Sequence, residues 1–365
     1  MRRGCPCQEF DCQVRQVTRH NADCHPPSGY SKKVFLMNIR RIASRLAANA
    51  LFACAALGSM PINGMGTAFA QDYPGKSIRM IVPFAAGGSI DVGTRMLAQR
   101  LTSRLGQSVI VENKAGAEGV IGTEFVIKSA PDGYTILAVG GSSYTPALVK
   151  NLPFDLIRDL QPITLTRVGP SAVMVNAAFL PKNIAELQTL VKANPGKLNF
   201  GGSTAPTSLA TEMFKKAAGI DGLVVPYKGS GPVQTGLLSG EIQIALDPPA
   251  SYKALIDSGR LRILVITDKE RLAMFPNAAT TYEQGVNMSF ATNTGFWFPA
   301  RTPKPIVDRM NKEIVAVVLE PDMKKWVEST GSVPIGSTPE YFRDFIARDH
   351  AFLAEAAKMV NYQPQ

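Results

Sequence analysis

Beyond residue 70 the chain contains no cysteine and one histidine, His350, although the whole 365-residue sequence has five cysteines and three histidines. Without a thiol, that part of the chain forms no internal disulfide and offers no cysteine nucleophile or thiolate metal ligand. A single histidine also excludes the two-histidine H-E-x-x-H motif of zinc peptidases. No run of about 18 apolar residues follows Gln71, so no membrane-spanning helix is expected there.

The motifs of hydrolytic enzymes are also missing. No G-x-S-x-G nucleophile elbow occurs, and no S-x-x-K stands at a glycine-rich turn. His350 lies in a predicted C-terminal helix, distant in sequence from every glycine-rich loop. We therefore expect no enzymatic activity, no catalytic residue, no cofactor and no bound metal, and a secreted hydrolase is the weaker alternative.

Net charge is small over most of the chain. The formal charge is +10, but residues 1–70 contain nine Lys/Arg and only three Asp/Glu, which leaves +4 for residues 71–365. The basic character therefore belongs mainly to the N-terminus. This distribution removes the main argument for a nucleic-acid partner, and we expect none.

The N-terminal part has the pattern of an export signal. Residues 37–45 are positively charged, residues 46–57 are apolar but too short to span a bilayer, and A-F-A at 68–70 supplies small residues before a cleavage site. We predict a signal peptide at 37–70 and a periplasmic product.

Residues 1–36 are polar and unpatterned, so we expect translation to begin at Met37 and the first 36 residues to be an upstream extension. One alternative to cleavage after Ala70 is lipidation at Cys54. Another alternative is a genuine extension that binds metal, although the spacing of its cysteines lacks the paired C-x₂-C knuckles of zinc sites. Those cysteines are Cys5, Cys7, Cys12 and Cys24.

Four glycine-rich turns follow strand-like segments. In the first, MIVPFAAGGSID at 80–91 reads as a buried strand, a turn and the start of a helix over 92–105. Glycines let backbone N–H groups face a ligand, and the helix start adds a partial positive charge. We expect a positive φ at Gly88. Similar turns lie at 140–143, 201–204 and 228–231, so the four loops together could bind one small anion.

The order of elements predicts two α/β lobes. Strands at 78–82, 109–112 and 135–139 alternate with helices, which is typical of a parallel sheet. A second alternating series begins near 172 and ends with a strand at 263–267, and the segment from 303 to 358 is mainly helical. Within the second series we expect helices at 184–193, 208–218, 232–239 and 251–258 and strands at 197–200, 223–226 and 242–246.

The extended segments 165–175 and 291–298 are the expected crossovers between the lobes. They divide the chain into a discontinuous lobe I, 71–172 plus 298–365, and a lobe II, 173–297. Because ligands bind outside the carboxyl ends of strands in open α/β sheets, the glycine-rich loops should line a cleft between the lobes.

Several motifs then resemble one family in their order along the chain. They are YPGKSIR (73–79), VPFAAGGSID (82–91), VENKAGAEGVIG (111–122), APDGYTIL (130–137), VPYKGSGP (225–232), SGRLR (258–262) and PARTPKP (299–305). Over residues 72–365 the chain resembles the periplasmic solute-binding proteins of tripartite tricarboxylate transporters, the Bordetella uptake gene (Bug/TctC) family.

This resemblance implies a periplasmic-binding-protein type II fold, a Venus flytrap that closes on a small carboxylate and delivers it to a membrane permease. It also implies that the inner carboxylate is held by backbone N–H groups and ordered waters from loops matching 85–91 and 140–144. The opposing loops match 202–208 and 228–231. A monomer is expected. A sensor subunit that presents its ligand to a signalling partner needs the same cleft and is the alternative.

The candidate ligand-binding residues follow from these loops. Asp91 either complements the helix dipole or positions pocket water, Lys228 either meets a distal carboxylate or braces a lobe, and Asp247 either caps a helix or contacts the ligand. The full set is Phe84, Ala86, Gly87, Gly88, Ser89, Asp91, Ser142, Ser143, Tyr144, Gly202, Ser203, Thr204, Ser208, Lys228, Gly229 and Asp247.

The sequence departs from the family pattern in two respects. It has no histidine at 142–146 or near 207–209, and Glu118 stands where a glycine is usual. These departures leave the binding role intact, but the identity of the carboxylate stays open.

Overall fold

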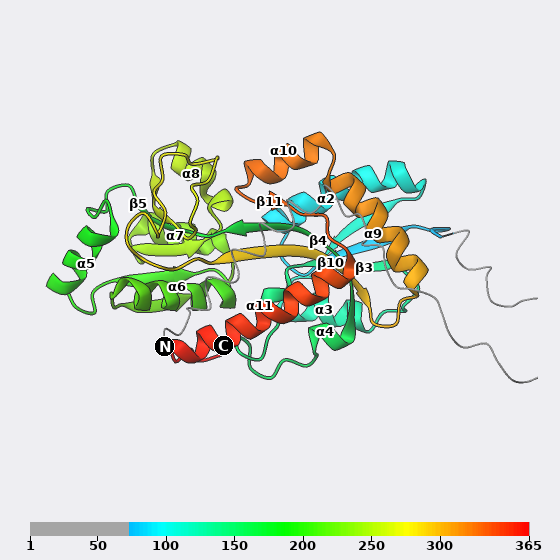
Figure 1. Ribbon diagram of the computed structural model, residues 1–365, viewed down its shortest axis with the longest axis horizontal. Helices are drawn as coiled ribbons and strands as arrows, with labels where there is room; N and C mark the ends of the chain where they lie inside the picture. Colours follow the sequence, from blue (N-terminus) through cyan, green and yellow to red (C-terminus); the bar gives the residue numbers. More distant parts are fainter. Residues whose placement is uncertain (1–72, 365) are drawn as a thin grey trace, which may run out of the picture.

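The computed structural model describes residues 73–364 (Figure 1). The predicted extension, signal peptide, cleavage site and Cys54 all lie outside the described residues. Within them, no helix is both long and apolar enough to cross a bilayer. The described chain forms two α/β lobes, each built on its own sheet, as the sequence predicts.

The first lobe contains a six-stranded sheet in the order β11-β4-β10-β3-β1-β2. Its parallel part is β1 (Ile78–Val82) between β2 (Val109–Asn113) and β3 (Thr135–Val139). The crossovers are α2 (Ser89–Leu105) and α3 (Val120–Ile127), the latter after a 3₁₀ turn. These predicted strands and crossover helices are confirmed, because apolar β-branched runs and an amphipathic helix can be recognised locally.

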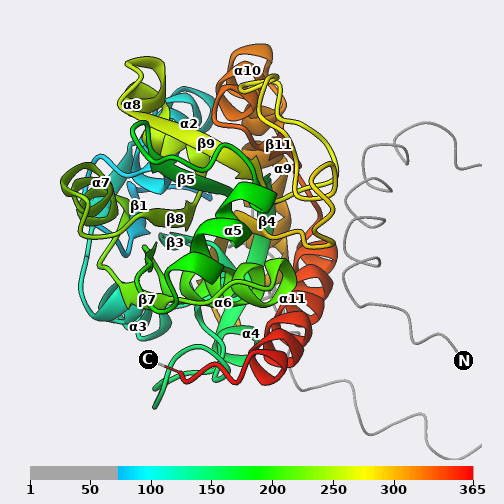
Figure 2. The same ribbon diagram turned by 90° about the vertical axis from the view of Figure 1, so that its left-hand side faces the viewer.

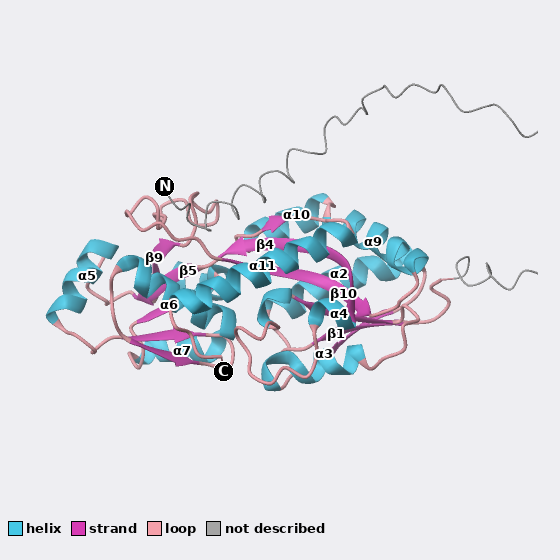
Figure 3. Ribbon diagram, turned by 60° about the horizontal axis from the view of Figure 1, so that its bottom comes forward, coloured by secondary structure: helices cyan, strands magenta, loops and turns pink. Residues whose placement is uncertain are grey.

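The rest of this sheet is antiparallel, which no sequence pattern predicted. β4 (Leu160–Pro170) and β10 (Ala291–Pro299) pair antiparallel along their whole length, and β10 also pairs antiparallel with β3 (Figure 3). The expected crossover 165–175 contains the end of β4 and most of β5 in the other sheet, whereas the expected return 291–298 lies within β10, in the middle of the six-stranded sheet. β11 (Val333–Pro334) completes the edge beside β4.

Helices cover both faces of this sheet. On one face α2 packs with α9 (Lys304–Val318) and α10 (Pro321–Ser329) around Met80, Phe296 and Phe298. On the other, α3, α4 (Leu156–Asp159) and α11 (Pro339–Met359) surround Leu137 and Trp297. The C-terminal helices thus return to the first lobe.

The second lobe contains a five-stranded sheet in the order β7-β6-β8-β5-β9. β6, β8 and β7 are parallel, whereas β5 runs antiparallel to β8 and β9. The strands are β5 (Ala172–Asn176), β6 (Asn199–Gly202), β7 (Leu223–Pro226), β8 (Ile244–Asp247) and β9 (Leu261–Ile266), and the helices are α5 (Ile184–Ala193), α6 (Ala205–Ala218), α7 (Ser230–Ser239) and α8 (Lys253–Asp257).

Two of these helices begin earlier than predicted. α6 begins at Ala205 because the Thr204 side chain accepts a hydrogen bond from the Thr207 backbone N–H, and a proline in the first turn fits there. α7 begins at Ser230, directly after Gly229. The helix expected at 251–258 is divided into a 3₁₀ turn at Pro249–Tyr252 and the short α8.

The two connections between the sheets touch at one point. The Ser171 backbone N–H, between β4 and β5, donates to the Phe290 carbonyl at 3.0 Å. The Thr267 hydroxyl donates to the carbonyls of both Ser171 (2.8 Å) and Phe290 (3.0 Å). The segment that enters the second lobe and the segment that leaves it are therefore hydrogen-bonded side by side.

β10 belongs to the six-stranded sheet from Ala291 onward, while the lobe boundaries themselves stay a prediction.

Helix α11 contacts both lobes. Its first half packs against β4, and its last turns enter the core of the second lobe through Leu353, Ala356 and Ala357. Figure 2, which views the second lobe end-on, shows the end of α11 beside α6. Tyr362, just beyond the helix, also packs against that core.

Candidate ligand-binding site

The first glycine-rich turn lies between β1 and α2 and is open to solvent from Ala85 to Gly88. Gly87 has φ = +84°, whereas Gly88 has φ = −71° and is the N-cap residue of α2. The expectation of a positive φ at Gly88 is wrong by one residue, because Gly87 makes the turn. Gly88 has no side chain with which to cap the helix, so the first-turn N–H groups can bind an anion.

Asp91 holds this turn in shape. One of its oxygens accepts from the Gly87 N–H (2.9 Å) and from Arg95 (3.1 Å), and the other accepts from the Asn113 amide (2.9 Å). Burial alone would raise the pKa of the Asp91 carboxyl, but these hydrogen bonds together hold it below its usual value. Asp91 thus braces the loop, and a direct ligand contact stays a prediction.

The second loop follows β3 and forms a 3₁₀ turn at Gly141–Ser143. The Ser142 hydroxyl donates to the Asp349 carboxylate at 2.7 Å and accepts from the Asn293 amide, while the Asn293 oxygen accepts from the Gly141 N–H (3.1 Å). Sequence reasoning missed both Asn293 on β10 and Asp349 on α11. Burial raises the pKa of Asp349 to about 6.

His350 lies against this loop, although it is distant from the loop in sequence. Its Nε2 is 2.9 Å from the Gly141 carbonyl, which can only accept, so Nε2 carries the proton. Burial lowers the pKa of His350. Ser142 donates to Asp349 and not to this ring, so Ser142 lacks the serine–histidine hydrogen bond that activates a nucleophile.

Tyr144 ends the second loop as a buried side chain. Within residues 73–364 its hydroxyl has no hydrogen-bond partner. A Cβ on Gly119 would overlap that hydroxyl and lie 3.3 Å from Phe84, so glycine at 119 lets the first and second loops meet. Buried hydroxyls are usually satisfied, which makes Tyr144 a candidate donor to a bound group.

In the second lobe, Ser203 and Asp247 form a similar pair. The Ser203 hydroxyl donates to one Asp247 oxygen at 2.6 Å, and the Tyr252 hydroxyl donates to the other at 2.8 Å. Burial raises the pKa of Asp247 to about 6. Each lobe therefore anchors a Gly-Gly-Ser segment on a buried carboxylate, and both Asp247 oxygens are already engaged.

The remaining predicted residues of this lobe surround that segment. A Cβ on Gly202 would lie 2.8 Å from the Ser208 Cα, so only glycine fits the approach of β6 to α6. The Ser208 hydroxyl is buried without a partner in the described part of the chain. Gly229, with φ = +100°, donates its N–H to the Ser203 carbonyl (2.9 Å), which joins the third and fourth loops.

The loops of the two lobes also approach each other. The 3₁₀ turn of the second loop contacts α6, whose start carries Thr204 and Ser208. Lys228 of the second lobe is exposed. Burial raises the pKa of Glu118 in the first lobe, and the positive charge of Lys228 opposes that rise. Glu118 has φ = +53°. The structure thus assembles the predicted loops around the junction of the lobes, while their contact with a ligand stays a prediction. Ala86 is exposed in the first loop.

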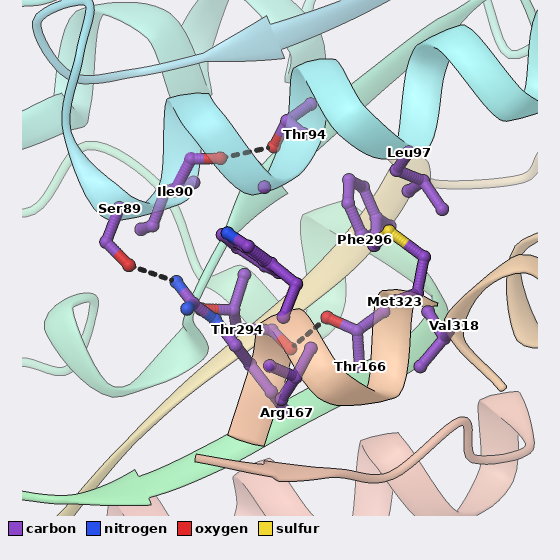
Figure 4. A pocket seen from close by; sticks show the side chains of 13 residues that line it. Ser89, Ile90, Thr94, Leu97, Thr166, Arg167, Thr294, Phe296, Val318 and Met323 are labelled. Atoms are coloured by element: carbon purple, nitrogen blue, oxygen red, sulfur yellow. Dashed lines mark hydrogen bonds between the residues drawn. The ribbon is translucent and has the colours of Figure 1, made fainter. Parts of the chain in front are cut away.

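A small cavity lies beneath the first turn of α2 (Figure 4). Its volume is about 30 Å³, and its lining includes one charged side chain, Arg167 of β4. No sequence pattern pointed to Arg167 as a functional residue. What distinguishes Arg167 is that no acidic side chain pairs with it in the folded structure of the described residues, and a sequence does not show this. The other lining residues are Ser89, Ile90, Gly93, Thr94, Leu97, Thr166, Thr294, Phe296, Val318, Met323, Trp326 and Val327.

Comparison with solved structures defines the class of the fold. The structure of the periplasmic binding protein BugD matches with a TM-score of 0.73 and 32% identity, over 80% of this chain and 100% of that one. An R. palustris protein solved with adipate matches with a TM-score of 0.76 and 28% identity, again over 80% of this chain and 100% of that one. The two α/β lobes are therefore those of a periplasmic binding protein.

Sequence comparison then gives the family. The model of the tripartite tricarboxylate transporter family receptor matches residues 94–353. Protein BugT of Bordetella pertussis is 34% identical over 322 residues, which are 85% of this chain and 94% of BugT. The chain belongs to the tripartite tricarboxylate transporter receptor (Bug/TctC) family, whose members are periplasmic solute-binding receptors and not enzymes.

Proposed function

We propose that this protein is exported, captures one small organic carboxylate between its lobes and delivers it to the permease of a tripartite tricarboxylate transporter. The observation that carries the proposal is the open turn at Ala85–Gly88, where the uncapped first turn of α2 presents N–H groups beside the other loops. The relative solved with adipate supports a carboxylate as the ligand.

In this proposal the first and second loops hold one carboxylate group, and the second lobe completes the site. Tyr144 and Ser208 each have a buried hydroxyl beside one other hydroxyl, that of Thr123 and that of Tyr362 respectively, and a ligand oxygen would be a further hydrogen-bond partner for either. Lys228 meets a distal carboxylate. The proposed lobe I, 71–172 plus 298–365, carries the first two loops, and the proposed lobe II, 173–297, carries Lys228. Closure of the lobes therefore brings Lys228 toward the first two loops.

The experiment is a thermal-shift screen of the purified protein with mono-, di- and tricarboxylates, including adipate. A ligand at a hundredfold excess over its dissociation constant should stabilise the fold by roughly 2.7 kcal/mol. The mass of the recovered ligand should be unchanged, and the scattering radius should fall on binding. Absence of any shift across the panel would contradict carboxylate capture, and turnover of the acid would favour the hydrolase alternative.

Localisation has its own test. We expect the periplasmic fraction to yield a chain that begins at Gln71. An N-terminus at Met1 would contradict the predicted export signal at 37–70, and a lipidated Cys54 would establish the lipoprotein alternative.

A further inference from the structure

Arg167 is a partly buried guanidinium whose partners are all neutral hydroxyls. Its Nη2 donates to Ser89 Oγ at 2.9 Å, its Nε donates to Thr294 Oγ1 at 3.2 Å, and its Nη1 lies 3.5 Å from Thr330 Oγ1. Within residues 73–364, burial is the cause that acts on the Arg167 pKa, and no charged group contributes to it. Its charge therefore lacks a counter-charge in the described protein.

The surroundings of Arg167 make that charge effective. Trp326 lies over the guanidinium, with 5.6 Å from Cζ to the ring centre. Trp326 fits there because position 93 is glycine, since a Cβ would be 2.5 Å from the indole edge. Burial lowers the pKa of Arg167 to about 10, so the group stays charged at neutral pH. Charges in poorly solvated surroundings act strongly on their neighbours.

Two positive groups converge on Ser89. Ser89 is the first residue of α2, where the helix presents unpaired N–H groups, and its hydroxyl accepts from Arg167. An oxygen that accepts from a guanidinium turns its own hydrogen away, and such a hydrogen bond strengthens the hydroxyl as a donor. Within the described chain, the Ser89 hydroxyl accepts from Arg167 and makes no other side-chain hydrogen bond. The Ser89 hydroxyl is thus available to donate to a bound group.

The size of the cavity decides where an anion binds. Its volume of about 30 Å³ corresponds to roughly one water molecule, so an organic carboxylate does not fit beside Arg167. Ser89 directly follows the solvent-exposed turn at Ala85–Gly88 in the chain. An anion at that turn would contact the helix N–H groups and the Ser89 hydroxyl and would be the missing counter-charge of Arg167.

We propose that Arg167 is a positioning residue of the carboxylate site: it fixes the Ser89 hydroxyl as a donor toward the ligand and adds its positive charge to the helix terminus. This inference rests on the proposed function. It goes further by assigning part of the affinity to a residue that does not touch the ligand.

The test uses R167M and S89A, with adipate as the first probe and the strongest acid from the screen as the second. R167M should bind at least about tenfold more weakly, equivalent to ~1.4 kcal/mol. S89A, which keeps the guanidinium, should bind several-fold more weakly. The control is R262M, which removes another partly buried guanidinium, one that donates to the Phe179 and Pro181 carbonyls in the second lobe. It should bind as the wild type does.

Salt dependence separates a charge effect from a structural one. Affinity of the wild type should fall more steeply with NaCl than affinity of R167M, because the variant has lost one attracting charge, and R167K should restore the steeper slope. Equal affinities, or equal salt slopes, for wild type and R167M would overturn the inference. If R167M does not fold, unchanged affinity in S89A overturns it. A wild type that binds no acid would overturn the proposed function first.

Discussion

The Asp349→Asn variant should change how stability depends on pH. Asp349 is 3% exposed, accepts from Ser142, and has its pKa raised by burial to about 6, against about 4 when unfolded. Between about pH 4 and pH 6 the folded state therefore binds more protons at this group than the unfolded state does. The free energy of unfolding falls as pH rises through that window, and above it the cost of the buried charge is complete.

The size of the effect follows from the shift. About two pKa units correspond to roughly 3 kcal/mol, so D349N should gain about that much relative to wild type between about pH 4 and pH 7. A hydrogen bond that the amide cannot make lowers the free energy of unfolding of D349N by the same amount at every pH. The decisive quantity is therefore how the difference in free energy of unfolding between D349N and wild type changes with pH. Carboxyls with lowered pKa values, such as those of Asp91 and Glu112, tilt the curves of both proteins equally.

Urea unfolding at a series of pH values measures this difference directly. The matched control is Asp344→Asn on the exposed side of the same helix, which makes the same change of side chain without removing a buried carboxyl. If the difference between D349N and wild type stays constant across the series, the buried carboxyl titrates as it does in the unfolded chain and the reasoning fails.

Three other substitutions test the site and the fold. Gly88→Val should abolish carboxylate binding by titration calorimetry with little loss of stability, because its Cβ has room (3.7 Å to the Ala85 carbonyl) but its bulk fills the turn; wild-type affinity would place the pocket elsewhere. Lys228→Met should weaken dicarboxylates and spare monocarboxylates, and equal effects on both would remove its distal role. Gly295→Ala should lower the free energy of unfolding by roughly 3 kcal/mol, since its Cβ would lie 2.5 Å from Phe342 and 2.8 Å from the Thr164 carbonyl; an unchanged denaturation midpoint would contradict this packing.

The features that could be predicted are those written in neighbouring residues. Glycine-rich turns, apolar strands and amphipathic helices depend on spacings of a few residues, and these elements occur where expected. The start of α6 was misplaced because the Thr204 cap extends the helix beyond its apolar pattern. α7 has no side-chain cap and also begins before its apolar pattern, directly after Gly229.

The rest depends on residues far apart in the chain. Ser142 meets Asp349 across 207 positions and Asn293 across 151, and neither pairing leaves a local trace. For the same reason the pairing of β4 with β10 was not predicted, since antiparallel pairing between distant segments has no sequence spacing to reveal it. Arg167 is identified only by what does not surround it in three dimensions.

Helix α11 sets a mechanical limit on how the lobes can separate. A straight rod whose first half is fixed to β4 and whose last turns are embedded in the other core cannot lengthen, so its attachment points keep their separation. We therefore expect opening to be a rotation about an axis close to the helix, in which one lobe twists past the other, and we expect a wide separation to require the last turns of α11 to detach first. Spectroscopic labels placed at opposite ends of α11 should consequently report a constant distance in the ligand-free and ligand-bound protein, whereas labels on the loops across the junction should report the motion.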